Sequence, residues 1–184
     1  AERLIAELTA EPAGPVTVTG IEKKKENKNA PLLYNLAELQ NDCSKYFKIS
    51  PDETLRIVQE LYEKKMTTYP RTDARVLSTA VAKEIHKNIG GLRSYALATP
   101  FAKEVLEQGT YKNIAKTRYV NDKQITDHYA IIPTGQGLNN LAGLAPTAAK
   151  VYEVIVRRFL SIFYPPAVYQ KFSLTVKVKE ENFF

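Results

Sequence analysis

The fold is decided by residues 35–63, which read NLAELQNDCSKYFKISPDETLRIVQELYE. Asn35 belongs to the residue types that cap the start of a helix, and apolar residues follow it at helical spacing. Ser50 and Glu53 form a capping box around Pro51, which suits the first position of a second helix. The stretch therefore predicts two short helices joined by a tight turn, which is a helix-turn-helix unit.

Signals for helix starts and ends continue beyond this unit. A third helix is predicted to begin at Ser78 or Thr79 and to end at Gly90, and a fourth runs from Thr99 to Gly109. The Gly- and Asn-rich stretch from Gly135 to Gly143 predicts a loop. The longest predicted helix runs from Pro146 to Phe163, and its expected buried stripe consists of Val151, Ile155, Phe159 and Ile162.

Strand patterns flank this helical centre. Residues 2–8 have helical spacing, residues 12–15 are rich in Pro and Gly and break it, and residues 16–19 alternate as a strand would. Residues 172–178 alternate apolar and polar side chains, which predicts a half-buried antiparallel strand. The charged run at residues 22–29 predicts a solvated strand end or a mobile loop, and the alternative is a direct phosphate contact.

The sequence thus predicts a mainly α fold with flanking β-structure. Residues 31–165 form a helical domain, which is inserted between strands of an incomplete second domain made of residues 1–30 and 166–184. The chain starts with Ala1 rather than Met and stops inside a strand pattern. We therefore expect a segment of a longer protein.

Composition excludes several classes of protein. Of the 184 residues, 44% are hydrophobic and 25% are charged, which is typical of a soluble globular domain. No apolar run approaches the roughly 20 residues that a membrane span needs. One cysteine, Cys43, cannot form an internal disulfide or a cysteine-based zinc site, so we expect a reducing, cytoplasmic compartment.

The net charge of +6 and the pI of about 9.2 favour a polyanionic partner. Each lysine or arginine that replaces a counterion on a phosphate releases that ion to the solvent. Many proteins that bind no nucleic acid are equally basic, so charge alone leaves both interpretations open.

Residues 69–73, Tyr-Pro-Arg-Thr-Asp, carry the chemistry. Pro70 disfavours helical dihedral angles at Tyr69, so the tyrosine is expected at the end of an element. A phenol has a pKa of about 10 and needs help to act as a nucleophile. Arg71 can stabilise a phenolate or the phosphoryl oxygens under attack, and Asp73 can orient the guanidinium. The alternative is a buried structural tyrosine beside an ordinary surface ion pair.

Residues 69–73 resemble the active-site motif of the type IA DNA topoisomerases, especially of the bacterial topoisomerase III branch. Residues 31–36 resemble the entry to the third domain of that family, and residues 59–63 the helix before its nucleophile. Residues 127–134, DHYAIIPT, resemble its second motif, and residues 157–160 also fit. These motifs follow the family's order and cover nearly the whole chain.

The resemblance implies that Tyr69 attacks a DNA phosphodiester, forms a 5′-phosphotyrosyl link and releases a 3′-hydroxyl for religation after strand passage. Arg71 would position the phosphate, and His128 would lie near the scissile bond. Further support for the active site or for DNA binding would come from Gln59, Thr72, Asp73 and Thr134. Taken alone, His128 has a structural alternative as a packing residue. Ala74 departs from the serine that is common at this position in the family.

The resemblance also implies partners outside this chain. Family members bind Mg²⁺ through an acidic cluster in a Toprim domain, and no paired-acid motif of that type occurs here, so we expect no metal ligands in this chain. The helical domain would be winged-helix-like, and the flanking strands would belong to a β-rich arch domain. We expect a monomer at the bacterial nucleoid that binds single-stranded DNA, with Tyr62 or Tyr129 as stacking residues. The alternative is a non-catalytic winged-helix DNA-binding module.

Overall fold

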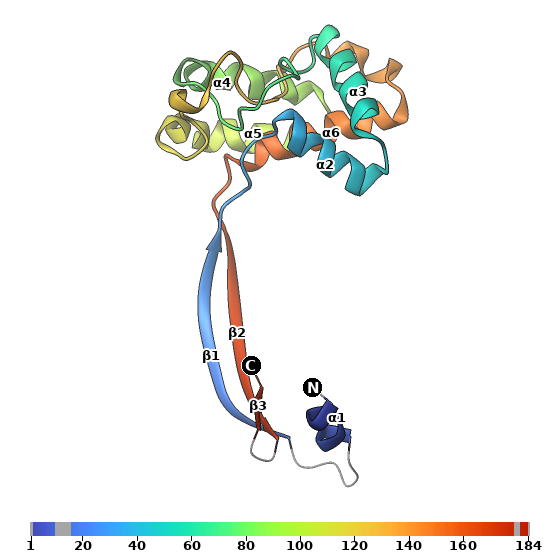
Figure 1. Ribbon diagram of the computed structural model, residues 1–184. Helices are drawn as coiled ribbons and strands as arrows, with labels where there is room; N and C mark the ends of the chain where they lie inside the picture. Colours follow the sequence, from blue (N-terminus) through green and yellow to red (C-terminus); the bar gives the residue numbers. More distant parts are fainter. Residues whose placement is uncertain (1, 10–15, 179–180, 184) are drawn as a thin grey trace. The chain divides into compact units, whose positions relative to one another are not determined.

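The chain divides into two compact units. The structure, a computed structural model, describes residues 2–9, 16–178 and 181–183. Residues Asn29–Pro165 form one unit, and Ala1–Lys28 with Pro166–Phe184 form the other (Figure 1). The expectation of a mainly helical fold with flanking strands is confirmed. No helix of the described residues is long and apolar enough to cross a membrane.

Five α-helices build the unit Asn29–Pro165 (Figure 1). They are α2 (Leu36–Phe47), α3 (Pro51–Glu63), α4 (Thr79–Gly91), α5 (Thr99–Gln108) and α6 (Pro146–Ser161). Short 3₁₀ helices connect them: η1 (Leu92–Ser94), η2 (Thr110–Lys116), η3 (Asp122–Gln124) and η4 (Leu138–Gly143). The predicted loop at residues 135–143 therefore contains a 3₁₀ helix. All five helices predicted beyond residue 35 are confirmed, to within two residues at their ends.

The helix caps follow the local sequence. The side chain of Asn35 accepts a hydrogen bond from the backbone N–H of Glu38, at 2.9 Å. The hydroxyl of Ser50 accepts one from the N–H of Glu53, at 3.1 Å, which is one half of the predicted capping box. Between them Lys48 has a φ of 58°, so the chain turns sharply through the left-handed region. The predicted helix pair is confirmed.

One hydrophobic core joins the helices of this unit. The whole predicted stripe of α6 is buried, and Phe159 is fully buried. Leu39 of α2 and Leu61 of α3 are also fully buried, and both α2 and α3 pack against α6. Burial removes the apolar surface of these side chains from water, and each fully buried side chain thereby stabilises the unit by about 1.5–3 kcal/mol.

Three extended segments cross this core and carry the candidate site. They comprise residues 33–35, 66–77 and 128–134. The hydrogen bonds between them are Leu33 N–H to Arg75 O (3.1 Å), Ile131 N–H to Tyr34 O (2.8 Å), Thr68 N–H to Ile132 O (3.0 Å) and Ala130 N–H to Val76 O (3.1 Å). The segments are therefore fixed to one another although they are far apart in the sequence.

The second unit contains α1 (Glu2–Thr9) and three strands, β1 (Val16–Lys28), β2 (Ala167–Val178) and β3 (Glu181–Phe183). All pairs are antiparallel, in the order β1-β2-β3, with an irregularity between Val18 and Gly20. The predicted helix near the start and both predicted strands are confirmed. The charged run proves to be strand through Lys28, and the predicted break at residues 12–15 lies outside the described residues.

One expectation about β2 is wrong. The strand has the predicted alternation, but its apolar face is not buried: Phe172 is 52% exposed and Leu174 is 48% exposed. The physical reason is that an alternating strand is covered only when a second layer packs on its apolar face. The three strands of this unit form a single layer, and none of its described residues buries Phe172 or Leu174.

Candidate active site

The segment that carries Tyr69 leaves α3 through a sharp reversal. Lys65 has a φ of 61°, which is the left-handed region that glycine usually occupies at this position. The N–H of Lys65 bonds to the carbonyl of Tyr62 at 2.8 Å, and the N–H of Met66 bonds to the carbonyl of Leu61 at 2.9 Å. These two bonds form a Schellman motif, and the buried pair Leu61 and Met66 closes it. The chain therefore turns directly into the extended segment that carries Tyr69.

Tyr69 lies between two other rings. Its ring centroid is 4.4 Å from that of His128 and 5.4 Å from that of Tyr62, the latter edge-on with an interplanar angle of 82°. Tyr69 is only partly buried, and its hydroxyl has no hydrogen-bond partner among the described residues. A structural tyrosine buried with a satisfied hydroxyl does not match this arrangement.

The tyrosine opens onto a surface pocket of about 550 Å³. Its lining comes from the end of α3, from the Tyr69 segment and from the His128 segment. The residues are Tyr62, Glu63, Lys65, Thr67, Thr68, Tyr69, His128, Tyr129, Thr134 and Gln136. A pocket of this size is large enough for a small ligand or for one part of a larger one.

Two threonines fasten the Tyr69 segment to the His128 segment. The hydroxyl of Thr72 donates to the backbone carbonyl of His128 at 2.9 Å and accepts from the N–H of Ala74 at 3.1 Å. The hydroxyl of Thr68 donates to the carbonyl of Ala130 at 3.0 Å. Sequence reasoning missed this role of Thr68, and nothing but its position beside Tyr69 pointed to it. Together these bonds hold His128 beside the tyrosine.

The expectation that the carboxylate of Asp73 orients the guanidinium of Arg71 is wrong. Both side chains are exposed, and no hydrogen bond or ion pair joins them within the described part of the chain. Asp73 instead offers its backbone carbonyl to the side chain of Asn35, at 3.1 Å. The physical reason is that this bond and the buried Thr72 fix the backbone, so both charged side chains extend into solvent. Neither lines the pocket.

The two remaining predicted site residues lie at the edge of the pocket. Gln59 does not line the pocket. Its side chain donates a hydrogen bond at 3.1 Å to the carboxylate of Glu63, which does line it. Thr134 lines the pocket, and its hydroxyl donates to the carbonyl of Lys65 at 2.5 Å. The hydroxyl of Thr67, 1% exposed, has no partner among the described residues.

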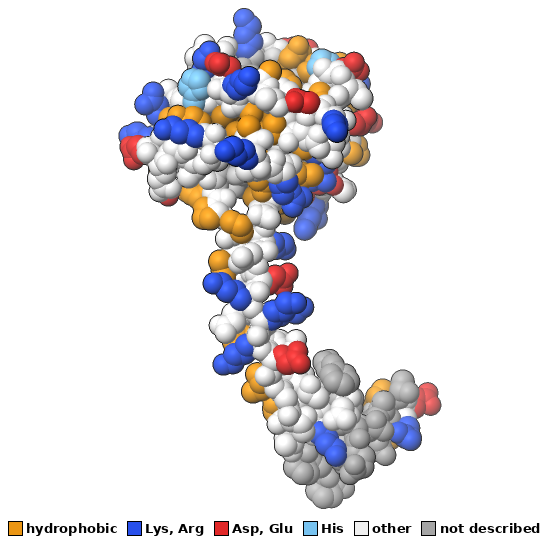
Figure 2. All heavy atoms as spheres, turned by 90° about the vertical axis from the view of Figure 1, so that its left-hand side faces the viewer, with side chains coloured by type: hydrophobic (Ala, Val, Ile, Leu, Met, Phe, Trp, Pro, Cys, Tyr) orange, Lys and Arg blue, Asp and Glu red, His pale blue; other side chains and the backbone are white. Residues whose placement is uncertain are grey.

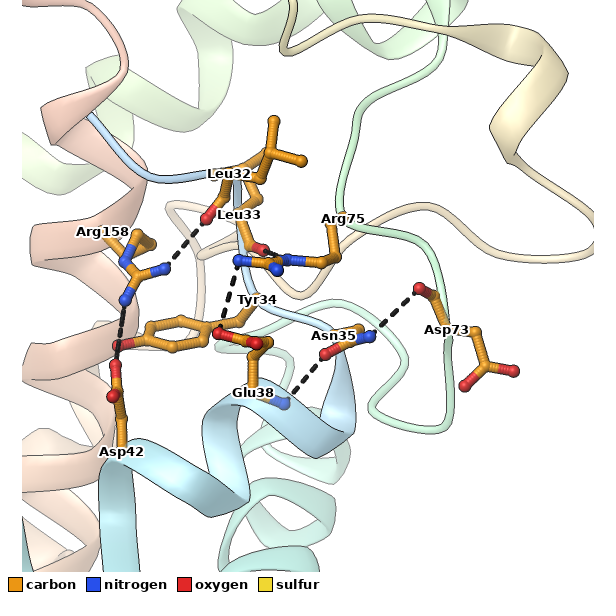
Figure 3. Close-up of polar contacts among 9 residues, drawn as sticks. All are labelled: Leu32, Leu33, Tyr34, Asn35, Glu38, Asp42, Asp73, Arg75 and Arg158. Atoms are coloured by element: carbon orange, nitrogen blue, oxygen red, sulfur yellow. Dashed lines mark hydrogen bonds and ion pairs between the residues drawn. The ribbon is translucent and has the colours of Figure 1, made fainter. Parts of the chain in front are cut away.

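The segment that precedes α2 is clamped from both sides (Figure 3). On one side Arg158 of α6 donates to the carbonyl of Leu32 (2.9 Å) and to the carboxylate of Asp42 (2.9 Å). On the other side Arg75 donates to the carbonyl of Leu33 and pairs with Glu38 at 3.3 Å. This segment also bonds to the Tyr69 segment and to the His128 segment, so the two bridges tie the site to α6 and to α2.

Burial raises the pKa of two tyrosines near this clamp and the pocket. The pKa of Tyr34 is raised by burial and by its hydrogen bond to Asp42, so it stays a neutral donor at physiological pH. Burial also raises the pKa of Tyr129. No three His, Cys, Asp or Glu side chains of the described residues come together as a metal site would require.

Comparison with known proteins agrees with this picture. A sequence profile of the DNA topoisomerase family matches residues 1–184. The chain is 38% identical over 170 residues to DNA topoisomerase 3 of Bacillus cereus, which covers 91% of this chain and 22% of that protein. It is 35% identical over 167 residues to DNA topoisomerase 3 of Bacillus subtilis, covering 90% of this chain and 22% of that protein.

A solved structure shows a similar fold. The chain matches full-length topoisomerase I from Thermotoga maritima with a TM-score of 0.62 and 20% sequence identity, over 97% of this chain and 28% of that one. At this identity the likeness concerns the fold alone. The chain spans about a fifth of the length of the Bacillus relatives. On the full-length match to the family profile and on these relatives, the chain belongs to the type IA DNA topoisomerase family.

Proposed function

We propose that the enzyme containing this chain cleaves and rejoins one strand of DNA, with Tyr69 as the nucleophile. The observation that carries the proposal is the pocket in which Tyr69 lies against His128, with ring centroids 4.4 Å apart. A partly exposed phenol with an unpartnered hydroxyl, beside an imidazole and open to solvent, is an arrangement suited to attack on a large substrate.

The reaction is a transesterification. The phenolic oxygen of Tyr69 forms a bond to a backbone phosphorus, the bond from phosphorus to the 3′-oxygen breaks, and the proton that the phenol loses is matched by the one that the 3′-oxygen gains. Religation is the reverse, so no bond energy is lost. The short distance between the rings of His128 and Tyr69 supports a role for His128 in exchanging a hydrogen bond with the reacting groups. The guanidinium of Arg71 is exposed and can bind a phosphate.

Single-stranded DNA is the proposed substrate. Tyr62 is 40% exposed at the pocket and offers a ring face to a base, whereas Tyr129 is more buried, so Tyr62 is the better stacking residue. On the face in Figure 2, Lys and Arg side chains lie around an apolar area of the unit Asn29–Pro165. Such a surface suits a polyanion with exposed bases.

Type IA topoisomerases in general use Mg²⁺. The described residues of this chain do not fit that ion, because no cluster of three carboxylate, histidine or cysteine ligands occurs among them. We therefore assign the Mg²⁺ ligands to a Toprim domain elsewhere in the enzyme and derive no step of the reaction through the metal here.

The finer assignments belong to the same proposal. Residues 31–165 are the winged-helix-like domain that carries the active-site tyrosine, and the antiparallel ribbon of β1 and β2 is part of the arch domain. The division of the chain at Lys28 and Pro166 supports this assignment. The enzyme is a cytoplasmic monomer that acts at the nucleoid, and Gln59, Asp73 and Thr134 support the pocket.

A covalent-trapping assay tests the proposal. The enzyme that contains this chain is mixed with Mg²⁺ and 3′-labelled single-stranded DNA, quenched in denaturant and scored for label attached to protein. We expect an adduct with wild type and none with Tyr69→Phe, and no adduct with 5′-labelled DNA. Tyr46→Phe is the matched control, because Tyr46 is 57% exposed on α2 and does not line the pocket.

Two outcomes would decide against this chemistry. An adduct that survives in Tyr69→Phe would place the nucleophile elsewhere. Binding of DNA by the wild type without any adduct would favour the non-catalytic winged-helix module instead.

A further inference from the structure

The pocket at Tyr69 has an electrostatic difficulty that the proposed function leaves unsolved. It lies at the C-terminal end of α3, where the helix dipole places negative partial charge. Glu63, an acidic residue of the last turn, also lines it. Both features disfavour a phosphodiester, and both disfavour the phenolate that forms as Tyr69 attacks. A cation within the pocket is needed to offset them.

Lys65 supplies that cation. It is the only lysine or arginine among the described residues that line the pocket, whereas Arg71 does not line it. Its side chain is exposed and forms no ion pair with any described residue. The position of its backbone is fixed by the Schellman motif and by Thr134, whose hydroxyl donates to its carbonyl. The ammonium is therefore unengaged on a rigid support.

We propose that Lys65 binds a backbone phosphate of the DNA strand in the Tyr69 pocket, and so is a phosphate-binding residue of the active site. This rests on the proposed function. The ammonium cancels the negative end of α3 and the charge of Glu63, and it holds the strand where the phenol can reach it.

The backbone conformation gives this proposal a clean test. At a φ of 61°, a side chain is disfavoured and glycine is not. A Lys65→Gly change therefore removes the charge while relieving the steric strain, and the relief offsets the freedom that glycine adds to the unfolded chain. We expect the urea midpoint of the variant to equal or exceed that of wild type, so a loss of DNA binding cannot come from misfolding.

The chain also provides a matched control. Lys48 is the only other non-glycine residue with positive φ in the described part of the chain, at 58°, and its side chain is also exposed. It precedes α3, whereas Lys65 follows it, so about 20 Å of helix separates the two positions. Lys48→Gly makes the same change in charge and in backbone strain, but it does so away from the pocket.

The experiment measures binding of fluorescein-labelled oligothymidylate by anisotropy, over a range of salt, using the whole enzyme in a Tyr69→Phe background. We expect Lys65→Gly to weaken binding about three- to tenfold and to reduce the slope of log K against log salt by about 0.7, the value for one phosphate contact on a single strand. Lys65→Arg should restore both quantities, and Lys48→Gly should change neither.

Equal behaviour of Lys65→Gly and Lys48→Gly, or an unchanged salt slope in Lys65→Gly, would overturn the proposal. The trapping assay keeps the two proposals apart. If wild type forms the Tyr69 adduct and Lys65→Gly binds DNA normally, only the role of Lys65 fails. If wild type forms no adduct, the proposed function fails, and the salt slope still reports whether Lys65 contacts phosphate.

Discussion

Replacing Arg158 with methionine should destabilise the helical unit far more than the same change at its neighbour. Arg158 makes three hydrogen bonds, to the carbonyl of Leu32 (2.9 Å), the carboxylate of Asp42 (2.9 Å) and the hydroxyl of Tyr34 (3.1 Å). Its guanidinium also lies 4.1 Å from the centre of the Tyr34 ring. Figure 3 shows this cluster between α6 and the segment before α2.

The expected loss of unfolding free energy in Arg158→Met follows from the burial of the ion pair that it breaks. The side chains of Arg158 and Asp42 are only 14% and 21% exposed, so Arg158→Met leaves a largely buried carboxylate without its cation. Breaking a buried pair costs about 3–5 kcal/mol. The value here should be near the lower end, about 3 kcal/mol, because Asp42 keeps some solvent and still accepts a hydrogen bond from Tyr34.

Arg157→Met is the matched control. Arg157 also pairs with a carboxylate, that of Glu153 at 2.7 Å, but its side chain is 69% exposed. An exposed pair of this spacing on a helix contributes about 0.3–0.5 kcal/mol. The two variants therefore remove the same residue type from adjacent positions of α6, with an expected difference of about 2.5 kcal/mol.

Urea unfolding, followed by far-ultraviolet circular dichroism, measures both changes. Of the six α-helices that the described residues form, five belong to the unit Asn29–Pro165, so the helical signal reports mainly on the unit that contains the cluster. The midpoint and the slope give the free energy of unfolding of each variant. If Arg158→Met lowers it by no more than Arg157→Met does, the buried cluster contributes no more to stability than an exposed ion pair.

Two adjacent glycines of α4 and the buried Cys43 give further predictions about stability. Gly90→Ala should raise the free energy of unfolding by about 0.5–1 kcal/mol, because an added Cβ meets no atom within 4 Å and alanine favours helix. Gly91→Ala should lower it by about 2–3 kcal/mol, because its Cβ would lie 2.0 Å from the carbonyl oxygen of Gly135, and urea titration compares the two. Burial raises the pKa of the Cys43 thiol from 9.0 to about 11, so the unfolded chain ionises first and this contribution to stability is lost as pH rises from 9 through 11. Cys43→Ala should show a smaller loss over that range, and native Cys43 should resist iodoacetamide until urea is added.

The sequence by itself determined the helices, because their signals are local. The caps at Asn35 and Ser50 and the apolar stripe of α6 depend on residues within one or two turns of each other. The residues of the tyrosine motif were also recognisable from the sequence, because their order and spacing resemble those of a known family. Their catalytic roles remain predictions.

Only the tertiary structure decided how these parts meet. His128 reaches Tyr69 because Thr68, Thr72 and the segment before α2 align extended segments that are far apart in the sequence. The same packing leaves Arg71 outside the pocket and brings in Lys65, whose left-handed conformation no local propensity predicts. The alternation in β2 likewise could not reveal that its apolar face is exposed. Burial of that face depends on the layer that packs against the strand, and the sequence of the strand carries no information about that layer.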